Sequence, residues 1–195
     1  MAEQTDKPNL KQPQPAAVEI KVEDFFTKVL SVIGKTTDQQ ISDLLKKSQQ
    51  TIAVAESLTG GIVSSHLTKY SGSSEYFIGG IVCYSSRVKV AAVGVPPAVI
   101  SQHGVVSKEV AISMAEEIRK RFKTDIGLGI TGVAGPHPLP PAPVGKIFIA
   151  LASDRETEWK ELSLQGTRAE IRGKAAQAAL GILWLHLGGK EIIGS

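Results

Sequence analysis

From residue 51 onward, short apolar runs alternate with longer stretches in which apolar residues recur every three or four positions. The short runs at 51–55, 76–84, 125–130 and 145–153 predict strands, and the periodic stretches between them, such as 57–70, predict helices. Strands that alternate with helices are typical of a layered α/β domain. We therefore expect an α/β fold, a three-layer α/β/α sandwich with a mixed, mostly parallel central sheet. The 76–84 and 145–153 strands are expected to run antiparallel to their neighbours.

Capping residues indicate where two of the later helices begin. Ser107 stands before an apolar helical stripe that reaches Phe122, which is the position of an N-cap. Thr167 and Glu170 match a capping box before a long helix that runs to Leu187. Two glycines follow that helix and predict its end.

The first 35 residues differ from the rest of the chain. Residues 1–20 are rich in Pro, Gln, Lys and Ala and have almost nothing to bury, so we expect a disordered tail. Residues 21–35 have apolar positions at helical spacing and predict an extra N-terminal helix. The folded domain is expected over 36–190, and its first helix is predicted to open at a capping box formed by Thr37 and Gln40.

Composition narrows the class of protein. Lys and Arg number 22 and Asp and Glu 19, and the basic residues are scattered, so a nucleic-acid-binding surface is not indicated. Cys83 is the only cysteine, which excludes an internal disulfide framework and a structural zinc site and suggests a reducing compartment. The N-terminus lacks the apolar core of a secretory signal, and no apolar stretch has the length of a membrane span. We therefore expect a soluble, cytoplasmic protein.

The first candidate for chemistry follows the first predicted strand. Glu56, Ser57 and Thr59 come directly before Gly60 and Gly61, at the start of a predicted helix. Free backbone N–H groups at such a position can hold an anion or a developing oxyanion, and the glycines allow a ligand to approach the backbone. Two interpretations stay open from spacing alone: Ser57 is a nucleophile, or Ser57 or Thr59 caps the helix.

A possible base for Ser57 follows the next predicted strand. Tyr84 and Lys89 can project from the end of that strand into the same cleft. A lysine that is partly desolvated loses its proton more easily and can deprotonate a serine hydroxyl. The alternative, a solvated surface lysine, is the more frequent outcome for such a pattern.

A third segment, Gly127-Leu-Gly129-Ile-Thr131-Gly132, matches the G-x-G-x-x-G pattern of dinucleotide-binding proteins. That pattern must open a helix between two parallel strands. Residues 133–145 contain five prolines, which cannot form such a helix. The segment is therefore interpreted as a strand that leads into a polar loop, with Thr131 at its tip.

Arg168 and Arg172 lie four residues apart, on one face of a predicted helix and close to its N-terminus. Arginine forks and a helix N-terminus both favour a phosphate group. An ion pair with a surface carboxylate, such as Glu170 or Glu161, is an equally good interpretation of the same pattern.

Together these segments resemble the CinA carboxy-terminal domain family, which includes the nicotinamide mononucleotide deamidases of the PncC type. The resemblance covers about residues 37–187. It rests on five motifs in register: Ala55-Glu56-Ser57-x-Thr59-Gly60-Gly61; Gly79-Gly80-x-Val82-x-Tyr84-Ser85 with Lys89; Val105-x-Ser107; Thr131-Gly132-x-Ala134-Gly135-Pro136; and Pro143-Val144-Gly145.

The resemblance implies hydrolysis of the carboxamide of nicotinamide mononucleotide to the carboxylate and ammonia, without a metal or other cofactor. It implies that Ser57 is the nucleophile, that Lys89 assisted by Tyr84 activates it and carries the proton to ammonia, and that Thr131 contacts the intermediate or the substrate. Backbone amides around Thr59–Gly61 would stabilise the oxyanion or bind phosphate. The substrate-binding positions implied in this way are Glu56, Thr59, Gly60, Gly61, Gly132, Arg168 and Arg172.

One segment departs from the family pattern. The family usually has glycines, an acid and a lysine before Pro-Val-Gly, whereas this chain has His137-Pro-Leu-Pro-Pro-Ala142. This difference supports an alternative hypothesis, a catalytically idle relative that acts as a protein-interaction module. The expected partners are a small nucleotide substrate and further copies of the same chain in a homo-oligomer.

Overall fold

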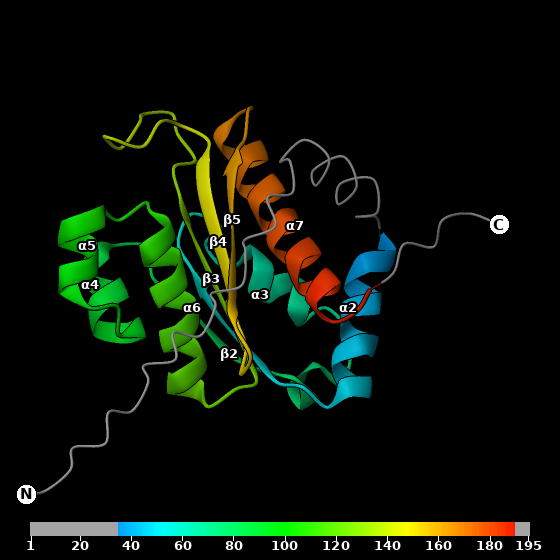
Figure 1. Cartoon of the computed structure of the whole chain (residues 1–195). Coiled ribbons are helices and arrows are strands. Elements are labelled where there is room, and N and C mark those ends of the chain that lie inside the picture. The colour runs from blue at the N-terminus through cyan, green and yellow to red at the C-terminus, as the bar shows by residue number, and fades with distance from the viewer. Residues whose placement is uncertain (1–34, 190–195) are drawn as a thin grey trace, which may run out of the picture.

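The computed structural model of this chain describes residues 35–189, and Figure 1 shows a central sheet between two layers of helices. The tail predicted over 1–20 and almost all of the helix predicted over 21–35 lie outside the described residues. The strands are β1 (Ile52–Glu56), β2 (Phe77–Val82), β3 (Ile126–Gly132), β4 (Lys146–Ala152) and β5 (Thr157–Ser163). The helices are α2 (Lys35–Ser48), α3 (Ile62–Leu67), α4 (Ser86–Val88), α5 (Pro97–His103), α6 (Lys108–Phe122) and α7 (Arg168–His186), with short turns of 3₁₀-helix η1 (Ser73–Glu75) and π-helix η2 (Lys89–Val93).

The five strands form one mixed sheet in the order β2-β1-β3-β4-β5. β1 is parallel to both β2 and β3, whereas β4 is antiparallel to β3 and to β5. Four strands therefore run in the same direction, which confirms the mixed, mostly parallel sheet and the antiparallel 145–153 strand. The expectation that the 76–84 strand is antiparallel was wrong, because α3 lies in the connection from β1 to β2 and makes it a crossover between parallel strands.

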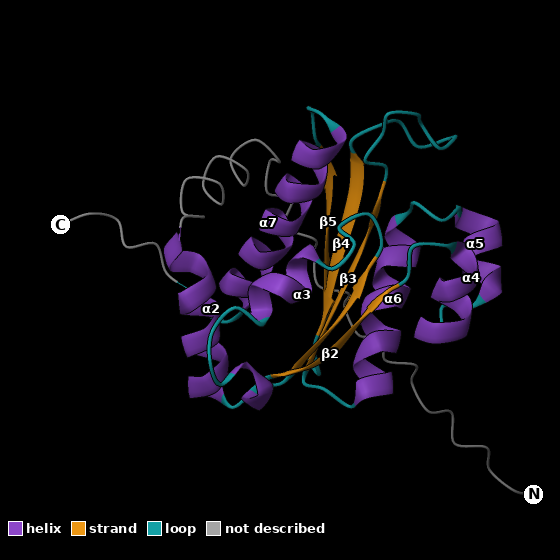
Figure 2. Ribbon diagram, turned by 180° about the vertical axis from the view of Figure 1, so that it is seen from behind, coloured by secondary structure: helices purple, strands orange, loops and turns teal. Residues whose placement is uncertain are grey.

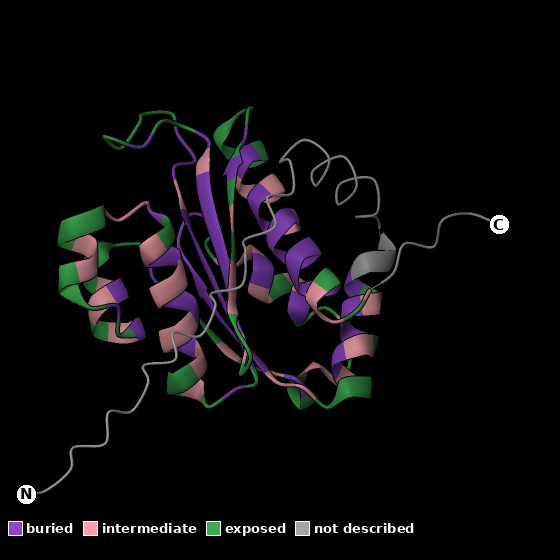
Figure 3. Cartoon of the chain, in the orientation of Figure 1, coloured by how far each residue is buried: buried purple, intermediate pink, exposed green. Residues whose placement is uncertain are grey.

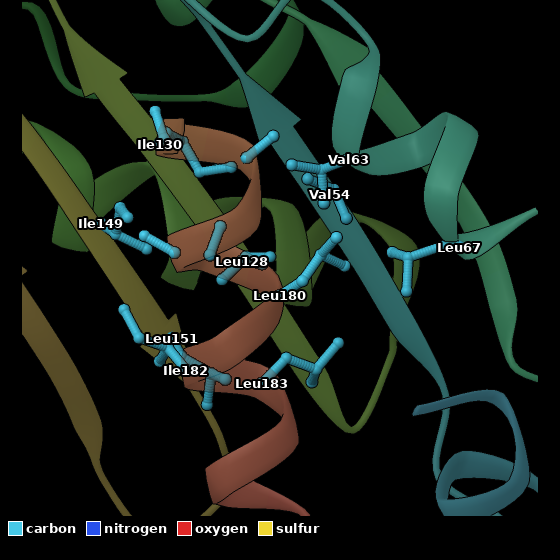
Figure 4. Packing of buried hydrophobic residues seen from close by; sticks show 14 of the residues in the cluster. Val54, Val63, Leu67, Leu128, Ile130, Ile149, Leu151, Leu180, Ile182 and Leu183 are labelled. Carbon is cyan, nitrogen blue, oxygen red and sulfur yellow. The ribbon is translucent and has the colours of Figure 1, made fainter. Parts of the chain in front are cut away.

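Each face of the sheet is covered by helices, as seen from both sides in Figures 1 and 2. On one face α7, α2 and α3 bury the largest apolar cluster, in which Leu180 and Leu183 of α7 lie among side chains of the central strands (Figure 4). On the other face α6 packs on the sheet, and α4 and α5 lie outside it. Buried residues accordingly concentrate in the sheet and on the inner faces of α6 and α7 (Figure 3). This arrangement is the predicted three-layer α/β/α sandwich.

Two glycines of the G-x-G-x-x-G segment explain how closely α6 approaches the sheet. Gly127 and Gly129 lie inside β3, as predicted. A Cβ atom at Gly127 would lie 2.1 Å from the Ala115 carbonyl oxygen, and one at Gly129 would lie 2.5 Å from that of Ala111. These glycines therefore allow the α6 backbone to rest against β3, and they do not form a nucleotide loop.

The capping predictions have mixed outcomes. The Ser107 hydroxyl accepts the Val110 N–H at the start of α6, and Thr167 and Glu170 form a complete capping box at the start of α7, so both predictions are confirmed. α2, in contrast, already includes Lys35, so Thr37 lies inside the helix and is not its N-cap.

The edge strand β5 and the short helices α4 and α5 were not predicted. β5 is an edge strand in which polar and charged residues outnumber apolar ones and Trp159 is the largest apolar side chain, so it lacks the apolar run of a buried strand. The helix predicted over 57–70 is shorter, because α3 begins at Ile62. Within the described residues, no helix combines the length and apolarity needed to cross a membrane.

Candidate active site

The carboxyl ends of β1, β2 and β3 meet at one edge of the sheet, where ligands commonly bind in open α/β folds. A cavity of about 400 Å³ opens there. Its lining residues come from the ends of these strands, from the segment before α6, from the loop after β3 and from the start of α7: Ser57, Leu58, Tyr84, Ser85, Ser86, Lys89, Val105, Val106, Thr131, Gly132, Val133, Ala134, Gly135, His137, Leu139 and Arg168. The structure thus brings together Ser57, Lys89, Tyr84 and Thr131, the four predicted catalytic residues.

Lys89 lines this cavity directly beside the candidate nucleophile. Its Nζ atom is 2.8 Å from Ser57 Oγ and donates to the Cys83 carbonyl oxygen over 2.8 Å. The side chain is 2% exposed, so the alternative of a solvated surface lysine was wrong. Within the described residues Lys89 forms no ion pair with a carboxylate, so no carboxylate stabilises its charged form.

The local backbone explains how Lys89 reaches Ser57. The Ser85 hydroxyl accepts the Val88 N–H and starts the short helix α4. The chain then widens into the π-helical turn η2, whose first residue is Lys89. Such π-helical turns are rare and frequently occur at functional sites. The sequence offered no signal for this turn, although it did place Lys89 shortly after the strand.

Burial shifts the pKa values of Lys89 and of the neighbouring Cys83. Removal from water lowers the pKa of the Lys89 ammonium, because the charged form loses its hydration. Burial also raises the pKa of the neighbouring Cys83 thiol, so no thiolate is available at neutral pH to stabilise that charge. A neutral Lys89 amine can accept the Ser57 proton while it still donates to the Cys83 carbonyl, which is the requirement for a general base.

Glu56, predicted to bind substrate, caps a helix instead. Its Oε2 atom accepts the amides of Gly61 (2.9 Å) and Val63 (3.2 Å), and its Oε1 atom accepts the amide (2.9 Å) and hydroxyl (2.6 Å) of Ser64. Glu56 is fully buried and does not line the cavity. The N-cap residue of α3 is Gly61, so neither Ser57 nor Thr59 caps the helix. Because the Glu56 carboxylate accepts the amides at the start of α3, the Ser57 hydroxyl is not needed as a cap. It contacts Lys89 instead.

The backbone amides around Thr59–Gly61 are not equivalent. The Gly60 amide donates to the Ser57 carbonyl over 3.2 Å and the Gly61 amide to Glu56, so both are occupied. For the Thr59 amide no acceptor is present among the described residues. The buried Thr59 hydroxyl also has no partner in that part of the chain. Thr59 is therefore the residue of this group with free donors.

The two arginines of α7 do not act as a pair. Arg168 lines the cavity, where it donates to the Gly135 carbonyl over 2.6 Å and to the Tyr84 hydroxyl. Arg172 does not line the cavity and donates to the carbonyls of Leu58 (2.9 Å) and Thr59 (3.0 Å). Neither arginine forms an ion pair within the described residues.

The carboxylates suggested as partners for these arginines are engaged elsewhere. Glu170 closes its own capping box at the start of α7. Glu161 pairs with Lys146 on the neighbouring strand β4. The ion-pair interpretation of the two arginines was therefore wrong.

The cavity is also lined by two further predicted residues, Thr131 and Gly132, and by residues that were not predicted. Thr131 is 1% exposed and donates to the Val105 carbonyl over 2.8 Å, which joins the end of β3 to the segment before α6. Gly132 lines the cavity beside it. His137 and Leu139 also line the cavity, so the unusual loop forms part of its rim. The sequence departure of this loop was the signal that could have indicated these two residues.

The fold and the site define an α/β domain with a buried serine–lysine pair at the carboxyl ends of its parallel strands. The sequence profile of the CinA C-terminal domain matches residues 34–187. A CinA-like protein of Koribacter versatilis is 40% identical over 175 residues, which cover 88% of this chain and 42% of that protein. A CinA-like protein of Myxococcus xanthus is 41% identical over 175 residues, with the same coverage of 88% and 42%. This chain belongs to the CinA C-terminal domain family, and it spans about two fifths of the length of these relatives.

Two solved structures have a similar fold. The competence or damage-inducible protein of Enterobacter asburiae superposes with a TM-score of 0.75 at 27% identity, over 77% of this chain and 96% of that one. A CinA superfamily protein of Klebsiella pneumoniae superposes with a TM-score of 0.76 at 22% identity, over 80% of this chain and 98% of that one. The described domain is thus similar to nearly the whole of each solved chain.

Proposed function

We propose that this chain hydrolyses the carboxamide of nicotinamide mononucleotide to nicotinate mononucleotide and ammonia, with Ser57 as nucleophile and Lys89 as general base. The observation that carries the proposal is the 2.8 Å contact between Lys89 Nζ and Ser57 Oγ inside a cavity, with the lysine buried and without a carboxylate partner among the described residues. Serine–lysine pairs are an established variant of the catalytic triad. The substrate is the one that the resemblance to the nicotinamide mononucleotide deamidases implies, and membership of the CinA C-terminal domain family is consistent with it.

The reaction follows from the geometry of the pair. Neutral Lys89 takes the Ser57 proton while Oγ bonds to the carboxamide carbon, which gives a tetrahedral intermediate with a negative oxygen. The intermediate collapses as the C–N bond breaks, and the Lys89 ammonium returns its proton to the leaving nitrogen, so ammonia departs. Water then attacks the ester on Ser57, again with Lys89 as base, and releases the carboxylate and the free serine.

The oxyanion requires donors that the resting structure does not use. The proposed donor is the Leu58 amide, because Leu58 lines the cavity and no acceptor for its amide is present among the described residues, whereas Thr59 is fully buried and does not line the cavity. Tyr84, whose side chain is 59% exposed at the cavity mouth, is the proposed aid to proton transfer next to Arg168. Thr131, which also lines the cavity, is the proposed contact to the reacting group.

Arg168 is the proposed phosphate ligand. It is the cavity-lining arginine, and it stands in the first turn of the 19-residue helix α7, whose dipole also favours an anion. A cavity of about 400 Å³ is within the usual range for a small-molecule site. Arg172 is not part of this proposal, because both of its contacts are to the backbone beside Ser57.

The second candidate is a protein-interaction module without activity, which the unusual 137–142 sequence supports. The loop lines the cavity only through His137 and Leu139, at its rim, and the Ser57–Lys89 contact does not depend on it. This geometry favours the enzyme. Self-association and a cytoplasmic setting stay predictions.

A direct assay separates the two candidates. Purified protein is incubated with nicotinamide mononucleotide, and ammonia and nicotinate mononucleotide are measured, with Ser57→Ala and Lys89→Ala in parallel. We expect turnover in the wild type and loss of it in both variants. Absence of turnover in the wild type would overturn the proposed substrate. Turnover that persists in Ser57→Ala would overturn the proposed nucleophile.

A further inference from the structure

We propose that two copies of this chain pair through the free edge of β5, antiparallel and around a two-fold axis at Trp159, so that one sheet continues through both copies. β5 is the last strand in the order of the sheet, and within the described residues no strand pairs with its outer side. The inference goes beyond the proposed function and does not depend on it. It gives the expected self-association a defined surface and a defined register.

The backbone of β5 has hydrogen-bonding groups that the sheet does not use. In an antiparallel pair, residues that exchange hydrogen bonds alternate with residues that do not. At the two ends of the β4–β5 pair, the Ser153 amide donates to the Glu156 carbonyl and the Leu164 amide donates to the Gly145 carbonyl, each over 2.9 Å. Both contacts continue the register of the pair, so the even-numbered residues of β5 bond to β4. The residues whose amides and carbonyls point away from the sheet are therefore Thr157, Trp159 and Glu161.

The side chains of β5 have unlike charges on one face. Leu162 is buried in the cluster that α7 covers, so Lys160 and Glu158, two and four residues earlier, face the same side of the sheet. Glu158 has His186 as a partner at 3.4 Å. Lys160 forms no ion pair within the described residues. The edge strand thus presents an acid and a base two residues apart, and the base has no carboxylate partner in that part of the chain.

These charges select one way of pairing. When a strand pairs antiparallel with a copy of itself, residues equally far before and after the two-fold axis lie opposite each other. With the axis at Trp159, Glu158 of each copy lies opposite Lys160 of the other. Axes at Glu158, Lys160 or Glu161 would place two like charges directly opposite each other, which is destabilising. Charged residues on an edge strand normally oppose pairing with other chains, and here they permit this register.

Trp159 lies at the centre of the proposed interface. Its side chain is 40% exposed and faces α6, where the Lys108 ammonium lies 5.3 Å from the ring centroid. In this register the two Trp159 residues lie opposite each other, and cross-strand aromatic pairs stabilise a sheet. The outward amide and carbonyl of each Trp159 bond to those of the other copy. One register therefore uses the free backbone groups, the unlike charges and the exposed aromatic ring.

The opposite edge of the sheet provides a control. β2 is also an edge strand, and its Ile78 and Val82 side chains are 46% and 50% exposed. It has no charged residue, so no charge pattern selects a register there. Ile78→Lys introduces one charge on that edge strand and serves as the matched variant.

The test reverses the two charges of β5 in the full chain. Sedimentation velocity over a concentration series measures the dissociation constant of the dimer, and circular dichroism verifies the fold of each variant. We expect a reversible dimer in the wild type. Glu158→Lys and Lys160→Glu, each alone, place like charges opposite each other twice in the dimer, so each should raise the dissociation constant at least about tenfold. Ile78→Lys should leave it unchanged.

Restoring the unlike pairs tests the register itself. The double variant with both reversals should return to within about threefold of the wild type. A mixture of the two single variants should form a mixed dimer, although each variant alone dimerises weakly, because the reversed residue of one copy meets the reversed residue of the other. Absence of a wild-type dimer, single variants that dimerise like the wild type, or a mixture that stays monomeric would each overturn the inference. Loss of the dimer in Ile78→Lys alone would assign the interface to β2 and would also overturn it.

Hydrogen exchange gives a second readout that needs no substitution. In the wild type, the amides of Thr157, Trp159 and Glu161 should exchange more slowly at concentrations where the dimer predominates, measured by NMR. The amides of β2 should exchange at the same rate at all concentrations. Exchange at β5 that does not depend on concentration would contradict the proposal, whether or not the protein hydrolyses nicotinamide mononucleotide.

Discussion

The loop that follows β1 and the loop that follows β3 border the same cavity, but they are anchored very differently. The 57–61 loop is held by Glu56 from one side and by Arg172 from the other, with one buried carboxylate accepting three amides and a hydroxyl at the start of α3. The 133–145 loop is fixed at its base by the Val133 and Gly145 amides and near its start by Arg168, and its outer part projects from the domain as exposed chain (Figure 3).

This difference indicates a division of labour between the two loops: the buried 57–61 loop positions the nucleophile, and the exposed 133–145 loop affects which ligands enter the cavity. The position of the Ser57 hydroxyl is determined by many contacts in the buried part of the domain, as a nucleophile requires. The rim formed by His137 and Leu139 has few contacts, so a change of sequence there alters what the cavity admits without moving Ser57 or Lys89. The unusual loop is therefore expected to affect substrate range more than chemistry.

The largest effect is expected at the buried pair. Lys89→Met keeps the volume of the side chain and removes the base, and we expect kcat/KM to fall at least about 1,000-fold. The measurement is turnover of nicotinamide mononucleotide, with circular dichroism to verify the fold. A loss below about tenfold would show that another group deprotonates Ser57.

The same variant makes a prediction about stability and pH. The pKa of Lys89 lies below its ordinary value of 10.5 in the folded protein, so between these two values the unfolded chain binds the extra proton. The free energy of unfolding of the wild type should therefore rise with pH across that window and be lower on its acidic side. Urea unfolding at several pH values should show this rise, relative to Lys89→Met. Parallel curves for the two proteins would mean that burial does not shift the pKa of Lys89.

A smaller effect is expected at the anchor of the first loop. Glu56→Gln replaces an acceptor-only carboxylate by an amide and leaves buried donors of α3 with poorer partners, so we expect a loss of about 2–4 kcal/mol in the free energy of unfolding. Glu170→Gln is the matched control, because Glu170 also caps a helix but is exposed. The loss should be clearly smaller for Glu170→Gln. Equal losses would contradict the view that Glu56 anchors the nucleophile loop.

An effect of about tenfold is expected at Arg168. Arg168→Ala removes the link between Tyr84 and the Gly135 carbonyl and the proposed phosphate contact, so KM should rise about tenfold while kcat changes less. The measurement is a kinetic comparison of nicotinamide mononucleotide with the corresponding nucleoside. If Arg168 binds the phosphate, the variant should lose most of the preference for the nucleotide, and an unchanged preference would exclude that contact.

The smallest effect is expected at the loop rim. His137→Asn should change kcat by less than about threefold, because the side chain lines the cavity at its mouth and is exposed. Any change should appear in KM, measured across a set of carboxamide nucleotides. A loss of kcat comparable to that of Lys89→Met would place the loop in the chemistry and would contradict the division of labour.

Much of the fold could be predicted from local signals. Apolar runs predicted β1 to β4, and the cap residues Ser107 and Thr167 located the starts of α6 and α7, because these features depend on neighbouring residues. β5 was missed because this edge strand is mostly polar and lacks an apolar run. The site was predicted where residues follow strand ends, as at Ser57 and Lys89.

The contacts of Glu56 and Arg172 could not be predicted in the same way. Glu56 caps a helix that begins six residues later, through a carboxylate that the sequence pattern associates equally well with a ligand. Arg172 contacts backbone carbonyls that are more than a hundred residues away in sequence. Every residue has a backbone carbonyl, so the sequence does not indicate which ones an arginine contacts. Both contacts depend on the tertiary structure alone.

The central claim is that buried Lys89 is the base for Ser57, and the pH dependence of Ser57 labelling tests it most directly. A fluorophosphonate is reacted with the wild type and with Lys89→Met over a range of pH, and the adduct on Ser57 is quantified by mass spectrometry. The account predicts that wild-type labelling rises with pH through an ionisation below the ordinary lysine value of 10.5, and that Lys89→Met is labelled slowly and without this step. Equal rates and equal pH profiles for the two proteins would contradict it.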